Sequence, residues 1–217
     1  MSEVLYREMT KKDYPCIKKL ICEAFDFHHL TQDSQLLNYI ATLYLHECIT
    51  KSTYSEVAIK DNKVIGVILG NVKEEKKNFL NKINSRLSYI YTYFKLLFHN
   101  SQRKNSILKY FQAFENTYEE LIAGKEMEFQ GSVQLFIVSK ESRGLGVGKR
   151  LLSNLLKHMK DNNVKLLYVY TDSECNYGFY EHLGFELFNQ KSVYLDPVKS
   201  NVDIFLMLNN LTINCLY

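Results

Sequence analysis

Apolar residues follow two different spacings along the chain, and each spacing predicts one kind of element. Alternating or Val- and Ile-rich runs predict strands over residues 4–8, 56–60, 63–69, 133–138, 166–171, 185–188 and 203–208. Steps of three and four residues predict helices over 10–24, 36–44, 73–124, 147–162 and 177–183. This order of elements predicts an α/β fold with one mixed sheet, and no apolar run is long enough to span a membrane.

The helical segment between the third and fourth predicted strands carries two apolar stripes. The first stripe consists of Leu80, Ile83, Leu87, Ile90, Phe94 and Leu97. The second lies in a further helix over residues 106–122. Because an apolar stripe is usually buried by tertiary packing, we expect the first stripe to pack against the second helix as a helical hairpin.

The composition is that of a globular protein. The chain has 217 residues, of which 46% are hydrophobic and 24% are charged, and its net charge is +3. That charge is too small to indicate nucleic acid as a partner, and none is expected. The five cysteines form no C-x-x-C pair, which favours free thiols over a metal site. Together with a polar N-terminus, they predict a cytoplasmic protein.

The small net charge conceals an uneven distribution. Residues 73–109 contain nine basic residues and only two acidic ones, a net charge of +7, whereas the rest of the chain carries −4. A step of this kind is typical of an inserted element. The sequence therefore predicts a basic helical insertion at about 73–125.

A glycine-rich turn follows the strand at 133–138 and opens an amphipathic helix. Its sequence is Arg-x-x-Gly-x-Gly, from Arg143 to Gly148, with a third glycine at Gly144. Alternating glycines let the backbone approach a ligand closely, and the free N–H groups of a helix start favour an anion such as phosphate. The spacing fits neither a P-loop nor a dinucleotide fingerprint, because Arg143 and Lys149 stand where those motifs need glycine.

A second motif lies about thirty residues further on. Asn176 stands near a helix start, and a Phe-Tyr pair, Phe179 and Tyr180, leads to Leu-Gly-Phe at 183–185. In this order and at this separation, the two motifs resemble the GNAT superfamily of acetyl-CoA-dependent N-acetyltransferases. The resemblance covers residues 1–72 and 126–208. It implies a single domain over 1–217, with a mostly antiparallel central sheet flanked by helices and with the helical insertion between strands 3 and 4.

The resemblance also implies roles for individual residues. Backbone amides of the glycine turn hold the pyrophosphate of acetyl-CoA, the strand at 136–138 pairs with the pantetheine arm, and Tyr180 is the general acid. A tyrosine phenol suits that role, because its ordinary pKa near 10 keeps it protonated while a thiolate leaves. The implied acetyl-CoA contacts are Phe136, Ile137, Val138, Arg143, Gly144, Leu145, Gly146, Val147, Gly148, Lys149, Asn176 and Phe179.

The general base is harder to assign. Many members of the family have a Glu in the strand before the glycine turn, and here Gln134, which cannot accept a proton, occupies that position. Glu128 is taken as the candidate base. Glu126, His28 and His29 are alternatives, and a water chain would also suffice.

The acceptor and the insertion leave several hypotheses open. The acceptor is a small-molecule amine or a peptide. The alternative to an enzyme is a non-catalytic acyl-CoA-binding module or sensor, which the Gln134 substitution favours. The insertion covers the acceptor cleft, lies on a membrane surface, binds an anionic partner such as nucleic acid, or forms a homodimer contact.

Overall fold

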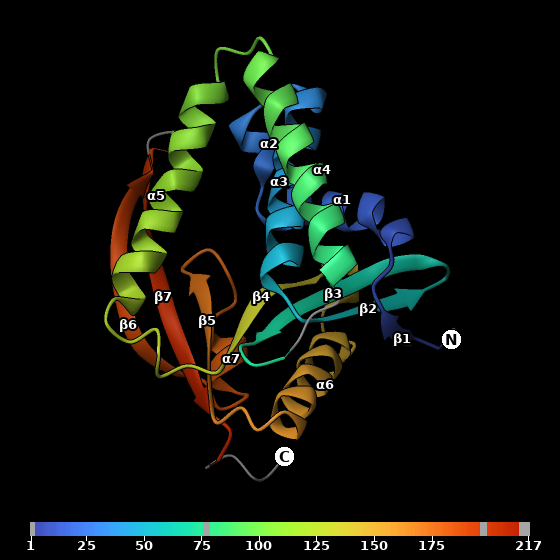
Figure 1. Cartoon of the computed structure of the whole chain (residues 1–217), viewed down its shortest axis with the longest axis vertical. Helices are drawn as coiled ribbons and strands as arrows, with labels where there is room; N and C mark the ends of the chain where they lie inside the picture. Colours follow the sequence, from blue (N-terminus) through green and yellow to red (C-terminus); the bar gives the residue numbers. More distant parts are fainter. Residues whose placement is uncertain (1–2, 76–78, 196–198, 213–217) are drawn as a thin grey trace.

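The computed structural model describes residues 3–75, 79–195 and 199–212, with residues 79–82 described by their backbone alone. Within these residues, one seven-stranded sheet has the order β1-β2-β3-β4-β5-β7-β6 (Figure 1). Every neighbouring pair is antiparallel except β4 and β5. The strands are β1 (Leu5–Glu8), β2 (Tyr54–Lys60), β3 (Lys63–Val72), β4 (Gly131–Val138), β5 (Leu166–Asp172), β6 (Glu186–Leu195) and β7 (Ser200–Asn210). The predicted mixed, mostly antiparallel α/β fold is confirmed.

Helices cover both faces of the sheet. They are α1 (Tyr14–Ala24), α2 (Phe27–Leu30), α3 (Ser34–Lys51), α4 (Phe79–Phe98), α5 (Lys104–Ile122), α6 (Val147–Asp161) and α7 (Gly178–Glu181), with 3₁₀ turns η1 (Lys11–Asp13) and η2 (Lys140–Ser142). Strand side chains alternate between faces, so Leu69 packs with α1 and α3 while Ile68 packs with α6. Ile204 and Leu206 of β7 pack with the end of α5, on the same face as α1 and α3.

Local sequence accounts for several element boundaries. Asp61 and Asn62 both have positive φ values, 50° and 61°, which the two-residue hairpin between β2 and β3 requires. Asp13 closes a capping box with Thr10 before α1, and it also accepts two hydrogen bonds of 2.8 Å from the Arg7 guanidinium. Asp33 caps α3 by accepting from the amides of Gln35 and Leu36.

The two helices between β3 and β4 do not form the predicted hairpin. Helix α4 packs against α3, whereas α5 packs against β6 and β7. Three side chains of α4 are buried, two small polar ones and a single leucine: Ser85, Thr92 and Leu96. The predicted core stripe, from Ile83 to Leu97, is instead exposed, and the side chain of Leu80 lies outside the described residues. The prediction was wrong because small polar residues let α4 approach α3 closely, and α5 buries its own apolar face on the sheet.

Polar contacts hold the connection between α4 and α5 to the start of α3. His99 Nε2 lies 2.7 Å from Asp33 Oδ2, and Arg103 donates to the carbonyl of Leu30 at 3.2 Å. That these two helices are an insertion in the family fold stays a prediction. Lys76 and Lys77 of the basic run lie outside the described residues. In the part of the chain that is described, no helix combines the length and hydrophobicity needed to cross a bilayer.

Candidate active site

The sheet opens along its single parallel seam. Strands β4 and β5 are paired only from Gly131 to Val133, opposite Leu167 to Val169. Beyond that point β4 continues paired with β3 alone and β5 with β7 alone. A register shift opposite Leu69 and Gly70 leaves Gln134 as an extra residue where the strands separate. The edge of β4 that faces β5 is thus available to an extended, amide-containing ligand at the carboxyl ends of the strands.

The glycine turn lies at the mouth of this opening, and two of its glycines have positive φ values. Gly144 and Gly146 have φ values of 78° and 75°, and a Cβ built on either would meet no atom within 4 Å. These glycines are therefore required by the backbone conformation and leave open space above the turn. The first turn of α6 leaves the amides of Val147, Gly148 and Lys149 without intrahelical partners, which makes an anion site.

Side chains around the turn divide into two groups. Arg143, Leu145 and Lys149 are exposed, so two cations flank the open amides. Val147, the first residue of α6, is buried and offers only its backbone. Gly148 packs closely on the aromatic rings, because a Cβ there would lie 3.3 Å from the ring of Phe136 and 3.5 Å from that of Phe179.

An aromatic cluster joins β4 to α7. The ring of Phe136 lies 5.5 Å from that of Phe179 and 6.2 Å from that of Tyr180, between ring centroids. Val138 is half-buried on the same side as Phe136, whereas Ile137 points to the opposite face and is buried under α1 and α3. The structure thus brings most predicted contacts together, but Ile137 offers only its backbone to the opening.

Tyr180 combines burial with a neighbouring carboxylate. Its side chain is 8% exposed, and among the described residues no hydrogen bond to its hydroxyl is found. Burial raises the pKa of this phenol well above 10, and Cys175 and Asp172 add to the increase. The hydroxyl is therefore held in its protonated form, as a proton donor must be.

The loop between β5 and α7 is an Asx turn. Asp172 Oδ1 accepts hydrogen bonds of 3.0 Å from the amides of Glu174 and Cys175. Burial raises the pKa of the Cys175 thiol to about 12, and Asp172 makes the next largest contribution. This cysteine is therefore not a nucleophile at neutral pH. Asn176 is exposed, and its carbonyl accepts from the amide of Phe179 at the start of α7.

Helix α5 forms the opposite wall. The ring of Tyr118 stacks on that of Tyr170 at 4.2 Å, and the Tyr170 hydroxyl donates to the Tyr118 carbonyl at 2.7 Å. Burial raises the pKa of Tyr110 to about 12, and Asp172 and Cys175 contribute to the increase. The same three influences, together with Tyr110 and Tyr170, raise the pKa of Tyr118. Tyr118 of the 73–125 segment therefore packs on β5, and Tyr110 is joined to it through the ring of Phe114.

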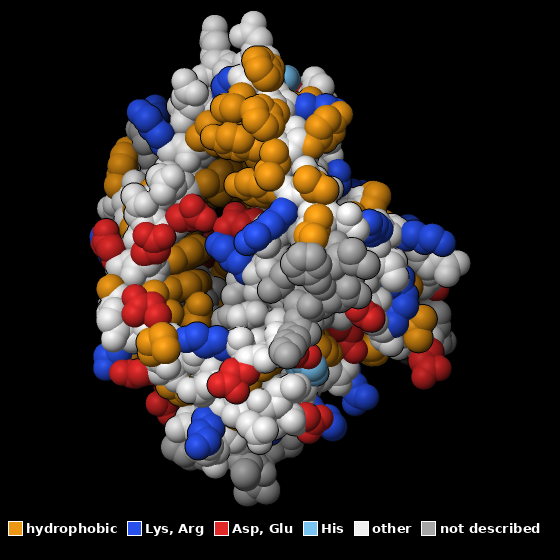
Figure 2. Space-filling model, viewed as in Figure 1, with side chains coloured by type: hydrophobic (Ala, Val, Ile, Leu, Met, Phe, Trp, Pro, Cys, Tyr) orange, Lys and Arg blue, Asp and Glu red, His pale blue; other side chains and the backbone are white. Residues whose placement is uncertain are grey.

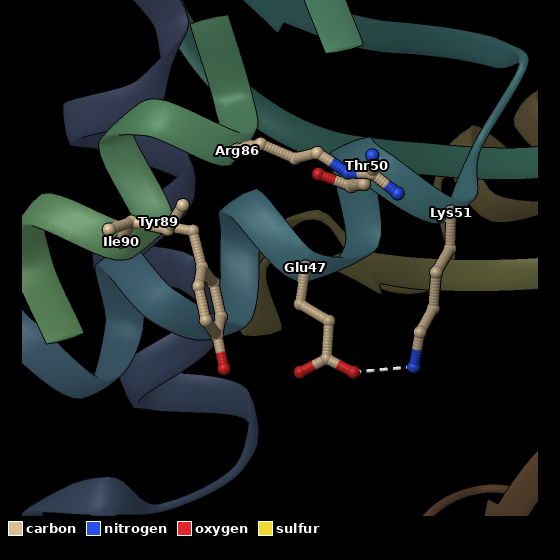
Figure 3. A pocket seen from close by; sticks show the side chains of 6 residues that line it. All are labelled: Glu47, Thr50, Lys51, Arg86, Tyr89 and Ile90. Carbon is tan, nitrogen blue, oxygen red and sulfur yellow. Dashed lines mark hydrogen bonds and ion pairs between the residues drawn. The ribbon is translucent and has the colours of Figure 1, made fainter. Parts of the chain in front are cut away.

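A groove of about 310 Å³ lies between α3 and α4 beside this wall (Figure 3). Lys51 Nζ lies 2.5 Å from Glu47 Oε1 and 3.8 Å from Glu115 Oε1. Burial raises the pKa of Glu115, and its hydrogen bond with Glu47 raises it further. Figure 2 shows acidic and basic side chains next to one another across the hollow between α5 and α4. The groove is thus lined by one carboxylate, Glu47, and two cations, Lys51 and Arg86, with Glu115 beside Lys51.

Tyr44 of α3 packs in an aromatic cluster beside the groove. Its ring centroid lies 6.2 Å from that of Phe27 and 6.5 Å from that of Phe111 in α5. Burial raises the pKa of Tyr44 well above its usual value. The groove was not predicted, because Glu47 and Glu115 are far apart in the sequence and carry no motif.

The candidate bases lie apart from Tyr180. Glu128 is exposed and pairs with Lys125 at 2.7 Å, in the segment that leads to the closed end of the β4–β5 seam. Glu126 is exposed in the same segment, and His28 and His29 are exposed on α2. Gln134 lies at the point of separation and donates to Ser132 Oγ at 2.6 Å.

Comparison with known proteins gives one family. A model of the acetyltransferase (GNAT) family matches residues 16–185. An N-acetyltransferase from Staphylococcus aureus Mu50 has a TM-score of 0.55 and 10% identity, covering 97% of this chain and 99% of that one. The ribosomal-protein-S18-alanine N-acetyltransferase from Escherichia coli has a TM-score of 0.52 and 10% identity, covering 96% of this chain and 94% of that one. A chain of the NatC complex bound to Gag peptide and CoA has a TM-score of 0.50 and 14% identity, covering 96% of this chain and 98% of that one. The curated proteins contain no significant match.

Replacing Gly146 with Ala tests the anion site. We expect CoA affinity to fall by about tenfold or more in calorimetric titration. The strained turn would move its backbone amides out of hydrogen-bonding position for the phosphates of CoA. Gly124→Ala is the matched control, since Gly124 has φ 76° and open space around it but lies outside the opening. Both variants should lose about 1 kcal/mol of stability. Equal CoA affinity in the two variants would contradict the assignment.

Proposed function

Because the chain belongs to the acetyltransferase (GNAT) family, we propose that it moves the acetyl group of acetyl-CoA directly to a primary amine, with Tyr180 as general acid. The chain is an acyltransferase, and the family uses acetyl-CoA. One observation carries the finer proposal. The open edge of β4, the open amides of α6 and the protonated hydroxyl of Tyr180 meet around a single aromatic cluster.

The residues of the opening fit acetyl-CoA. The unpaired edge at 134–138 suits the amides of the pantetheine arm, and the amides of 147–149 with Arg143 and Lys149 suit the pyrophosphate. Open space over Gly144 and Gly146 leaves room for the phosphate groups. Phe179 packs beside the pantetheine arm. Asn176, at the start of α7, is exposed and can contact the same arm.

The proposed mechanism is a direct transfer. Bound acetyl-CoA supplies a thioester whose C–S bond breaks as the amine nitrogen bonds to the acetyl carbon. Tyr180 donates its hydroxyl proton to the departing sulfur, and the amine gives up one proton to a base. Tyr180 is suited to the first transfer because burial, with smaller contributions from Cys175 and Asp172, keeps it protonated.

The acceptor amine is proposed to enter on the side of α5, where Tyr118 packs on β5 and adds aromatic surface. The groove between α3 and α4 is lined by Glu47 together with Lys51 and Arg86, so its charges of both signs do not select a cation. We propose a small-molecule amine or a peptide as the acceptor, with its reacting amine in the opening.

Asp172 is the carboxylate that we propose takes the amine proton. It is the last residue of β5, and its charge contributes to the raised pKa values of Tyr180, Tyr110 and Tyr118. Its Oδ1 is engaged with backbone amides, which fixes the direction of Oδ2. Glu128 as base stays a prediction that no contact supports, because its ion pair lies towards the closed end of the seam.

Location and assembly also stay proposals. We propose a cytoplasmic protein. The four described cysteines, Cys16, Cys22, Cys48 and Cys175, are free thiols, as predicted, and Cys215 lies outside the described residues. A homodimer stays a prediction.

Tyr180→Phe tests the acid. We expect kcat to fall by about a hundredfold, with little change in CoA affinity, because one phenol oxygen is removed from an aromatic cluster that keeps its packing. Free-thiol release with acetyl-CoA and a panel of amines measures kcat.

The raised pKa of Tyr180 also predicts that the wild type loses no activity through phenol ionisation up to about pH 10. Unchanged kcat in the variant across this pH range would exclude the role. Binding of acetyl-CoA without thiol release for any amine would favour the sensor alternative.

Asp172→Asn tests the base. Asparagine keeps an oxygen for the amides of Glu174 and Cys175, so the turn should persist while kcat/KM at pH 7 falls by about a hundredfold. Glu174→Gln, an exposed residue of the same turn, should leave kcat/KM unchanged. If Glu128→Gln rather than Asp172→Asn abolishes turnover, Glu128 is the base.

A further inference from the structure

Helix α4 turns its hydrophobic face outward. Seven exposed apolar side chains on this helix define what we call the α4 face: Ile83, Leu87, Ile90, Tyr91, Phe94, Leu97 and Phe98. Their steps of three and four residues place them on one side of the helix. Leu87 is 60% exposed, Phe94 55% and Phe98 86%. Figure 2 shows hydrophobic side chains gathered along the upper part of the molecule, where α4 lies.

The opposite side of α4 explains why this face is notable. Only small polar residues and one leucine are buried towards α3: Ser85, Thr92 and Leu96. A helix of an ordinary globular protein has the reverse arrangement, with its apolar stripe inward and its polar residues outward. A continuous exposed apolar surface of this kind marks an interaction site rather than chance exposure.

The segment that carries the α4 face has charges of one sign. From Lys76 to Lys109 the sequence has eight basic residues and no acidic one. The helix spacing puts Arg86 on one border of the face and Lys95 on the other. Lys95 Nζ lies 4.4 Å above the centre of the Tyr91 ring, at the edge of the hydrophobic surface, while Arg86 lines the groove that also contains Glu47. On the helix itself, the face therefore has an apolar and aromatic centre with a positive rim.

We propose that the α4 face docks the protein on an anionic lipid bilayer, with the helix lying in the plane of the interface. Aliphatic and aromatic side chains enter the boundary between headgroups and acyl chains, and the basic rim contacts acidic headgroups. Tyr91, with an apolar ring and a polar tip, suits this depth. This docking goes beyond acetyl transfer and does not depend on it.

The charges favour an anionic bilayer over a second copy of the chain or a nucleic acid. A two-fold contact between two copies brings each face against itself, so the basic rims oppose one another. Nucleic acid would require cations at the centre of the surface to meet phosphates, and the centre here is apolar. An anionic bilayer complements both the centre and the rim.

The chain contains no tryptophan, which allows a direct optical test. Phe98→Trp places a single indole on the α4 face, and Tyr194→Trp places one on β6, where Tyr194 is 60% exposed. With vesicles of phosphatidylcholine and 40 mol% phosphatidylglycerol, added as about 1 mM lipid, we expect a blue shift and protection from acrylamide quenching for the first variant. The second variant should show neither. Vesicles of phosphatidylcholine alone should give a much smaller shift.

Co-sedimentation with the same vesicles measures the contribution of the side chains. Leu87→Gln/Phe94→Gln/Phe98→Gln should lower the partition coefficient by about tenfold or more, because three apolar side chains leave the interface. The matched control is Leu5→Gln/Leu187→Gln/Tyr194→Gln, three residues of similar exposure on β1 and β6. Lys95→Glu should weaken binding to anionic vesicles, and Lys63→Glu, on the β2–β3 hairpin, should weaken it much less.

Circular dichroism of each variant separates lost docking from lost folding. Equal partition of the triple variant and its control would overturn the proposal. So would a concentration-dependent dimer in sedimentation velocity that the triple variant abolishes, in a protein that does not bind anionic vesicles. Neither result depends on acetyl-CoA, so the proposal fails or stands independently of the proposed enzyme activity.

Discussion

The candidate site depends on the early separation of β4 from β5. Both strands keep an antiparallel partner on their outer side, β3 for one and β7 for the other, so the sheet stays intact while its central seam opens. The extra residue at Gln134 marks the point of separation. Without the opening, the edge of β4 would be paired, and the glycine turn and Tyr180 would face a closed sheet.

The two sides of the opening have different chemistry. On the side of α6 and α7, open amides, two cations and the rings of Phe136 and Phe179 suit a long anionic ligand. On the side of α5, the ring of Tyr118 stacks on Tyr170, beside a groove whose lining contains Glu47, Lys51 and Arg86. We propose that the acceptor approaches from this side and acetyl-CoA from the other.

Local features were predictable from the sequence, and long-range ones were not. The hairpin at Asp61 and Asn62, the positive φ of Gly144 and Gly146, and the aromatic face of α5 each follow from neighbouring residues. The approach of Glu47 to Glu115 depends on how α3 and α5 are placed by the whole sheet. Periodicity showed which residues of α4 share a face, but not which face is buried, because that depends on the competing partner α3. The burial of Tyr180 beside Asp172 likewise required the fold.

Amide hydrogen exchange with and without CoA tests the central claim most directly. The account predicts that CoA slows exchange in residues 134–138 and in the turn at 144–149, because their open amides gain partners, while β1 and β2 exchange as before. Protection confined to the groove between α3 and α4, or unchanged exchange along β4 at saturating CoA, would contradict it.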